Sequence, residues 1–139
     1  MSTNERSAVP ERSRGVNIAL WGAQILLAGY FAFVAANKLL GASAEVVLFD
    51  EIGLGQWFRY VTGVVELAGA VGLLLPRLAG IAALALAGVM VGATATNLFV
   101  LEDGAILAAQ TTALLVLFLL LAWGRWPWTR SLVDRIRGL

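Results

Sequence analysis

A single glutamate, Glu66, interrupts a long apolar stretch that runs from Val61 to Leu75. A carboxylate near the middle of a membrane span is costly unless it has a partner or water, so such residues are candidate functional sites. In that setting a carboxylate can accept a hydrogen bond from a ligand or exchange a proton. Glu66 is therefore the first residue in this chain to which chemistry can be assigned.

Other polar side chains fall at similar depth in the neighbouring apolar stretches. Glu66 lies about ten residues into its stretch, roughly 15 Å along a helix. Lys38 and Arg59 lie near the same end of their own stretches, as do several threonines, whereas the opposite halves are almost entirely apolar, with Gln24 the main exception. We expect a polar pocket between the helices that is open to the outer leaflet. No residue is assigned a catalytic role. The predicted ligand-binding residues are Lys38, Arg59, Glu66, Asn97 and Gln110.

Each of these residues also has a structural interpretation. Lys38 and Arg59 could extend their charged ends to the lipid headgroups. Glu66 could be a structural charge paired with Lys38 or Arg59, or a protonated acid bonded to Asn97 or Gln110. Amides and threonines within membrane helices often form hydrogen bonds between helices.

The composition indicates an integral membrane protein. Of the 139 residues 60% are hydrophobic and only 14% are charged, unlike a soluble domain. The chain contains no cysteine and no histidine, which excludes disulfides, thiol redox chemistry and imidazole ligation of haem. No metal site and no nucleic-acid partner is expected, and whether the protein is an enzyme stays open. Any oxidoreductase role would need a bound quinone or a partner subunit.

The predicted fold is an all-α antiparallel bundle of four transmembrane helices, within a membrane domain at 15–123. Pro76 ends the second span, and the short connection after it requires the second and third spans to form a hairpin. Residues 1–14 are predicted to be a disordered cytoplasmic tail and 124–139 an amphipathic segment on the membrane surface. The 41–55 connection should be a short interfacial helix or a re-entrant piece. The four spans are expected at about 17–40, 56–75, 78–101 and 105–123.

The arginines predict the orientation. In this topology eight of the 10 basic residues fall on the side of the termini, which places both termini in the cytoplasm of a bacterial cell, at its inner membrane. Trp123, Trp126 and Trp128, with Arg125 and Arg130 between and after them, should form an interfacial collar. Gly88 and Gly92 form a GxxxG pattern that favours close helix packing.

Several short motifs resemble the DoxX-like family over about residues 17–122. They are Asn37-Lys38-Leu39-Leu40-Gly41, Phe49-Asp50-Glu51-Ile52-Gly53, Gly63-Val64-Val65-Glu66-Leu67-Ala68-Gly69-Ala70, Leu74-Leu75-Pro76 and Val89-Met90-Val91-Gly92-Ala93. The resemblance implies a four-helix inner-membrane bundle in which Lys38 and Glu66 occupy the family's characteristic charged positions. It also implies a link to quinone-dependent thiosulfate oxidation or membrane oxidoreductase complexes, as for some relatives.

Three functions are compatible with these observations. The leading hypothesis is a pocket around Glu66 that binds an amphipathic ligand, with a quinone as one candidate, in a protein accessory to a membrane redox or stress-response system. The second is a structural subunit of a membrane complex or a homo-oligomer. The third is a small carrier of a solute or proton, which the apolar inner halves of the spans disfavour.

Overall fold

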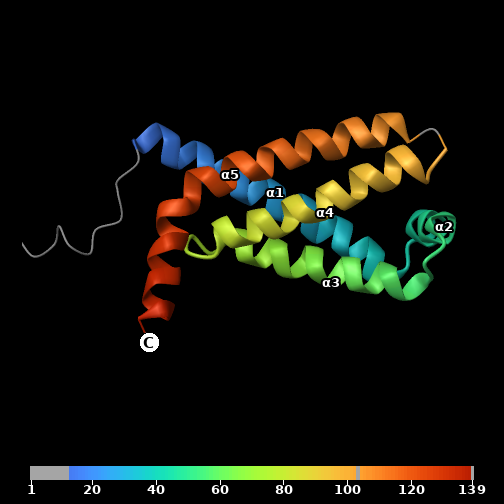
Figure 1. Ribbon diagram of the computed structural model, residues 1–139, viewed down its shortest axis with the longest axis horizontal. Coiled ribbons are helices and arrows are strands. Elements are labelled where there is room, and N and C mark those ends of the chain that lie inside the picture. Colours follow the sequence, from blue (N-terminus) through green and yellow to red (C-terminus); the bar gives the residue numbers. More distant parts are fainter. Residues whose placement is uncertain (1–12, 103, 139) are drawn as a thin grey trace, which may run out of the picture.

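The computed structural model describes residues 13–102 and 104–138, and within these ranges all of the regular secondary structure is helical (Figure 1). The predicted tail, 1–14, lies largely outside the described residues. The five helices are α1 (Arg14–Leu40), α2 (Ser43–Ile52), α3 (Gln56–Leu73), α4 (Ala79–Phe99) and α5 (Ala105–Arg137).

Three helices of the described chain are long and apolar enough to cross a membrane, namely α1, α4 and α5. Helix α3 is not among them, because Gln56, Arg59 and Glu66 lower its hydropathy. The large apolar side chains that the fold leaves exposed, such as Leu26 and Phe33, suit contact with lipid. The protein is therefore a small all-helical membrane protein.

The helix ends follow local sequence signals. The Ser13 hydroxyl accepts a hydrogen bond from the Val16 amide at 3.3 Å, which caps the start of α1. Helices α1 and α2 end at Gly41 and Gly53, whose φ angles of 75° and 82° are left-handed and favour glycine. The 41–55 connection consequently contains a short helix, α2.

Helix α5 continues beyond the predicted end of the fourth span. It runs without interruption to Arg137 and contains Pro127. Proline cannot donate the helical hydrogen bond and its ring crowds the preceding turn, so it bends a helix. Figure 1 shows the last part of α5 turning sharply away from the rest. Residues 124–137 are thus a bent continuation of α5, and their position at a membrane surface stays a prediction.

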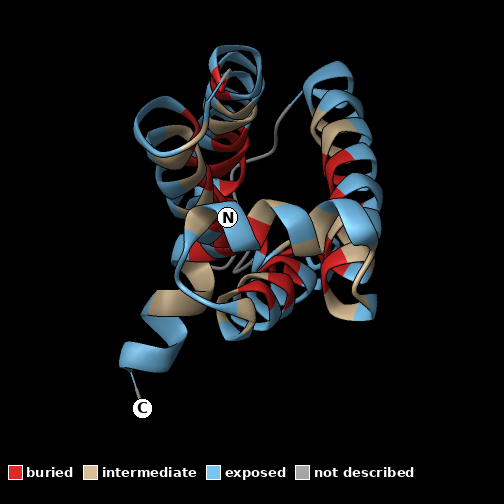
Figure 2. Cartoon of the chain, turned by 90° about the vertical axis from the view of Figure 1, so that its right-hand side faces the viewer, coloured by how far each residue is buried: buried red, intermediate tan, exposed pale blue. Residues whose placement is uncertain are grey.

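The helices pack as two pairs, α1 with α3 and α4 with α5, joined through contacts between α3 and α4. The pairs come together in an apolar core where the rings of Phe31 and Phe118 meet edge to face with centroids 5.2 Å apart. A methyl group at Gly69 would lie 2.7 Å from Leu86, so glycine is needed where α3 meets α4. Figure 2 shows the buried residues on the helix faces that point toward the interior.

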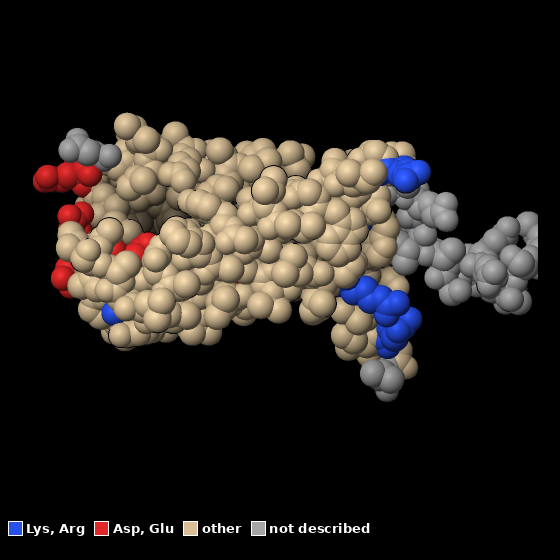
Figure 3. Space-filling model, turned by 180° about the vertical axis from the view of Figure 1, so that it is seen from behind, with Lys and Arg blue, Asp and Glu red and all other residues tan. Residues whose placement is uncertain are grey.

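The two pairs diverge toward the end of the molecule where α2 lies, which we call the α2 end (Figure 1). The opposite end, where α5 bends, we call the elbow end. Figure 3 shows the acidic side chains gathered at the α2 end and most of the basic ones at the elbow end. The expected close packing at Gly88 and Gly92 does not occur within the described chain, since a side chain added at either position would meet nothing within 4 Å.

Candidate functional site

The divergence of the helix pairs leaves a cavity of about 380 Å³ at the α2 end. Its walls come from α2, α3 and α4 and from the end of α1, and Figure 3 shows a recess at this end of the molecule. Most of the lining is apolar, including Phe49, Phe58, Val65 and Val89. Polar side chains occupy only a few positions, which is the pattern of a small-molecule site.

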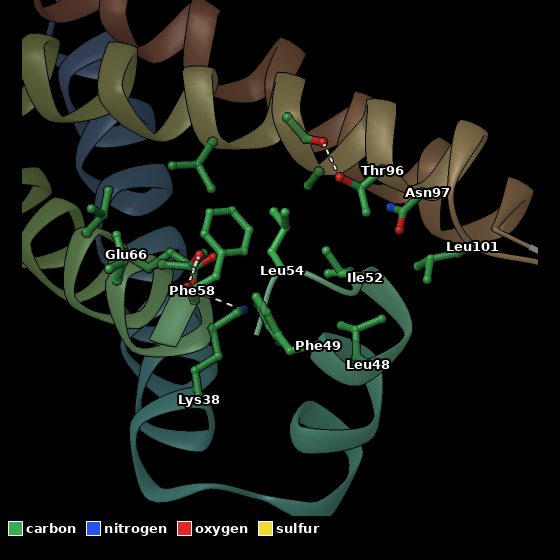
Figure 4. Close-up of a pocket in the computed structure, with 16 residues that line it drawn as sticks. Lys38, Leu48, Phe49, Ile52, Leu54, Phe58, Glu66, Thr96, Asn97 and Leu101 are labelled. Carbon is green, nitrogen blue, oxygen red and sulfur yellow. Dashed lines mark hydrogen bonds and ion pairs between the residues drawn. The ribbon is translucent and has the colours of Figure 1, made fainter. Parts of the chain in front are cut away.

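The principal charged group in the cavity is an ion pair between Lys38 and Glu66. The Lys38 ammonium lies 3.1 Å from Oε2 of Glu66 and 4.0 Å from Oε2 of Glu45. Lys38 and Glu66 are only 8% and 3% exposed, although both line the cavity (Figure 4). A buried charge is costly without a partner, so the two residues stabilise each other's ionised form.

A glycine on α3 allows this pair to form. A methyl group at Gly63 would lie 3.2 Å from Cβ of Lys38 and 3.0 Å from Cγ of Leu39. Gly63 therefore allows the end of α1 to approach α3 closely, one turn from Glu66. The predicted proximity of Lys38 and Glu66 thus depends on the contact between these two helices.

Arg59 does not line the cavity. Its guanidinium donates to the backbone carbonyl of Lys38 and, at 2.7 Å, to Oε1 of Gln56, and it lies 4.3 Å from the centroid of the Tyr60 ring. The Lys38 carbonyl belongs to the last turn of α1, where the helix dipole is negative and a cation is favourable. Arg59 thus fixes the end of α1 that carries Lys38, and it does not contact Glu66 directly.

The two predicted amides differ in their placement. Asn97 on α4 is 8% exposed and lines the cavity, on the side away from Lys38 and Glu66 (Figure 4). Its side-chain amide forms no hydrogen bond with any residue of the described ranges. Gln110 lies outside the cavity and donates to the Tyr30 hydroxyl at 3.1 Å. The cavity therefore brings together Lys38, Glu66 and Asn97, and leaves out Arg59 and Gln110.

Helix α2 contributes residues that the sequence did not identify as part of a site. Glu45 approaches Lys38, and Phe49, which is 4% exposed, forms part of the cavity wall. The signal for this was the prediction that 41–55 forms a short interfacial helix or a re-entrant piece. It did not indicate which of these residues would reach the charged pair.

A second polar cluster lies at the elbow end. Arg125, expected in the interfacial collar, is only 1% exposed and donates to Gln24 at 2.6 Å and to Asn17 at 2.9 Å. Gln24 in turn donates to the Leu73 carbonyl at 2.7 Å. This cluster fastens α5 to α1 and to the end of α3. A buried arginine could not be distinguished from an interfacial one by sequence, because its burial depends on how α5 packs against α1.

The chemistry available in the cavity is limited to hydrogen bonding, ion pairing and proton exchange. An ammonium can donate to a ligand oxygen, a carboxylate can accept from a hydroxyl, and an amide can do either. Among the described residues there is no group of three or more Asp, Glu, His or Cys side chains that could hold a metal ion.

Comparison with known proteins identifies the family but gives no structural template. No curated protein and no solved structure matches the chain. The model of the DoxX-like family matches residues 22–124, which include all of the residues that line the cavity. The resemblance found in the short motifs is thereby confirmed, and the chain belongs to the DoxX-like family.

Proposed function

We propose that the cavity binds a small amphipathic molecule whose polar end lies beside Lys38 and Glu66. The observation that supports this most strongly is a buried ion pair, with its atoms 3.1 Å apart, at the side of an otherwise apolar cavity. A charged pair with only a structural role does not require an adjoining cavity of about 380 Å³. The apolar part of the ligand would contact Phe49, Phe58 and the valines of α3 and α4.

A quinone is the ligand class that we propose to test first. Its carbonyl oxygen could accept from the Lys38 ammonium, and the hydroxyl of its reduced form could donate to Glu66. The amide of Asn97, on the other side of the cavity, is available for a second polar group. Because the chain has no cysteine or histidine, we propose a role accessory to a membrane redox or stress-response system that another protein completes.

The same proposal assigns the chain four antiparallel spans in a bacterial cytoplasmic membrane, with both termini in the cytoplasm. Helix α3 packs against α1 and α4, two of the candidate spans, and its 18 residues extend about 27 Å, close to the thickness of the hydrocarbon core. The separation of acidic and basic side chains toward opposite ends supports the orientation. The cavity would then open toward the outer leaflet.

A second function, a structural subunit of a membrane complex or a homo-oligomer, is favoured by a different observation. A side chain added at Gly88 on α4 would meet nothing within 4 Å in the described chain, and a glycine in such a position can pack closely against another helix. In this alternative, the Lys38–Glu66 pair only stabilises the fold.

Mass spectrometry of gently solubilised protein can separate the two functions. The informative variant is Lys38→Met combined with Glu66→Gln, which removes both charges and so leaves neither one buried alone. The matched control is Gln110→Leu, a polar-to-apolar change outside the cavity. We expect the double variant to lose small amphipathic molecules that co-purify with wild type and with the control. If the folded double variant keeps all of them, the structural function replaces the proposed one.

A further inference from the structure

A second groove lies at the elbow end, where α5 bends against α4. Its volume is about 510 Å³, and it is lined entirely by apolar or aromatic side chains. We call it the elbow groove, and its residues are Leu84, Leu119, Ala122, Trp123, Trp126 and Pro127. Trp123 is 71% exposed in spite of its size. Tryptophan is enriched where a protein crosses from lipid tails to headgroups.

Cationic side chains lie next to this groove. Arg130 follows Trp126 by one helical turn, so both lie on the same face of α5. Its side chain is 74% exposed, and its contact with Asp134, at 3.9 Å, is a weak exposed ion pair that leaves the arginine available. The turn that carries Arg77 is also close, because the Gly80 amide donates to the Thr129 hydroxyl at 3.1 Å.

The charge balance at this end is strongly positive. Apart from the buried Arg125, the described chain has five arginines here and one acidic residue, as the concentration of basic side chains in Figure 3 shows. They are Arg14, Arg77, Arg130, Arg135 and Arg137, opposed by Asp134. An apolar groove bordered by arginines matches a molecule that has both an acyl chain and a negative headgroup.

We infer that the elbow groove binds an anionic phospholipid. The acyl chain lies along Trp123, Trp126 and Leu119, and the phosphate group lies beside Arg130, one turn further along α5. Each basic residue near an anionic lipid surface contributes favourably to its binding. A zwitterionic lipid fits the same groove but gains less from the arginines. This site is at the opposite end of the molecule from the cavity, so it does not depend on the proposed function.

The test is native mass spectrometry of delipidated protein titrated with phosphatidylglycerol and with phosphatidylcholine that has the same acyl chains. We expect tighter binding of phosphatidylglycerol. Arg130→Gln should weaken that binding roughly five-fold and weaken the binding of phosphatidylcholine less, because the choline charge already offsets its phosphate. Arg135→Gln is the matched control, since it removes the same charge from the same helix but points about 140° away from Arg130. Trp126→Ala should weaken both lipids.

Three outcomes would overturn the inference. Equal binding of the two lipids would show that the groove does not recognise the negative headgroup. Equal losses in Arg130→Gln and Arg135→Gln would show that the positive charge acts diffusely and not at a site. Unchanged binding in Trp126→Ala would show that the lipid lies elsewhere. Circular dichroism checks that each variant is folded, which we expect for substitutions of exposed arginines. Arg130→Lys keeps the positive charge and should therefore keep the preference for phosphatidylglycerol that Arg130→Gln loses.

Discussion

At the scale of single residues, Lys38 is shared between two carboxylates. Glu66 is the closer partner at 3.1 Å, and Glu45 approaches to 4.0 Å from α2. Loss of one partner from a buried ion pair typically costs roughly 3–5 kcal/mol, because the remaining charge is left without compensation. Glu45 lowers this cost for Lys38 when Glu66 is neutralised. Glu66, by contrast, has no second ammonium partner within the described chain when Lys38 is replaced.

A double-mutant cycle should detect this pairing. Glu66→Gln and Lys38→Met should each lower the free energy of unfolding in detergent, with Lys38→Met the more damaging change because it leaves two carboxylates together. The double variant should be more stable than the sum of the single losses predicts, with a coupling energy of roughly 0.5–3 kcal/mol. The measurement is thermal or denaturant unfolding of the four proteins. Strict additivity would show that the two charges do not interact.

A second cycle, with Arg59→Met and Glu66→Gln, is the control. Arg59 donates to the Lys38 carbonyl and to Gln56, and it has no ion pair with Glu66. We therefore expect a coupling energy smaller than that of the Lys38–Glu66 cycle, because Arg59 acts on Glu66 only through the end of α1 that carries Lys38.

At the scale of helices, the contact between α1 and α3 determines whether the site forms. Gly63 lies where α1 approaches α3 closely beside Lys38. Gly63→Leu should push α1 away from α3, lower stability by roughly 1–3 kcal/mol and weaken the coupling between Lys38 and Glu66. Gly29→Leu on α1 is the control, because a side chain there meets nothing within 4 Å. Equal melting temperatures for the two variants would contradict the assigned helix contact.

The helices themselves were largely predictable from the sequence, but the end of α5 was not. Apolar stretches, Pro76 and the Glu102-Asp103-Gly104 turn predicted both ends of α1, α3 and α4, and the start of α5, to within a few residues. The continuation of α5 through Pro127 was not predicted, because proline can either end or bend a helix and only tertiary contacts determine which. Here Arg125 donates hydrogen bonds to α1, and the Thr129 hydroxyl accepts one from the Gly80 amide on α4. These hydrogen bonds hold the bent part in place.

Depth along the helix predicted part of the candidate site. It grouped Lys38, Glu66 and Asn97, which all line one cavity, and their role in binding a ligand stays a prediction. It also grouped Arg59 and Gln110 with them, although neither faces the cavity, because depth alone does not determine the rotation of a helix about its axis. The contribution of α2 depends on how a short helix folds back between two diverging pairs, which local sequence does not specify.

At the scale of the whole molecule, the charge separation predicts how the protein lies in the membrane. The basic elbow end should face the cytoplasm and the acidic α2 end the outside. Because the chain has no cysteine, single-cysteine variants report one position each. Cysteine at Gly138 or at Ser2 should resist an impermeant thiol reagent in intact cells, whereas cysteine at Ala44 should react. Strong labelling at either terminus would reverse the orientation and place the cavity at the inner leaflet.

The most direct measurement of the central claim is to fill the cavity without altering the ion pair. Gly92 lines the cavity on α4, and Gly88, one turn earlier, does not, while a side chain added at either position meets nothing within 4 Å. Gly92→Phe and Gly88→Phe therefore make the same chemical change on the same helix, and only the first places a ring in the cavity. Mass spectrometry of the small molecules that co-purify with each variant should show that Gly92→Phe loses the cavity ligand and Gly88→Phe retains it. Equal retention by two folded variants would contradict the claim that the cavity beside Lys38 and Glu66 is a binding site.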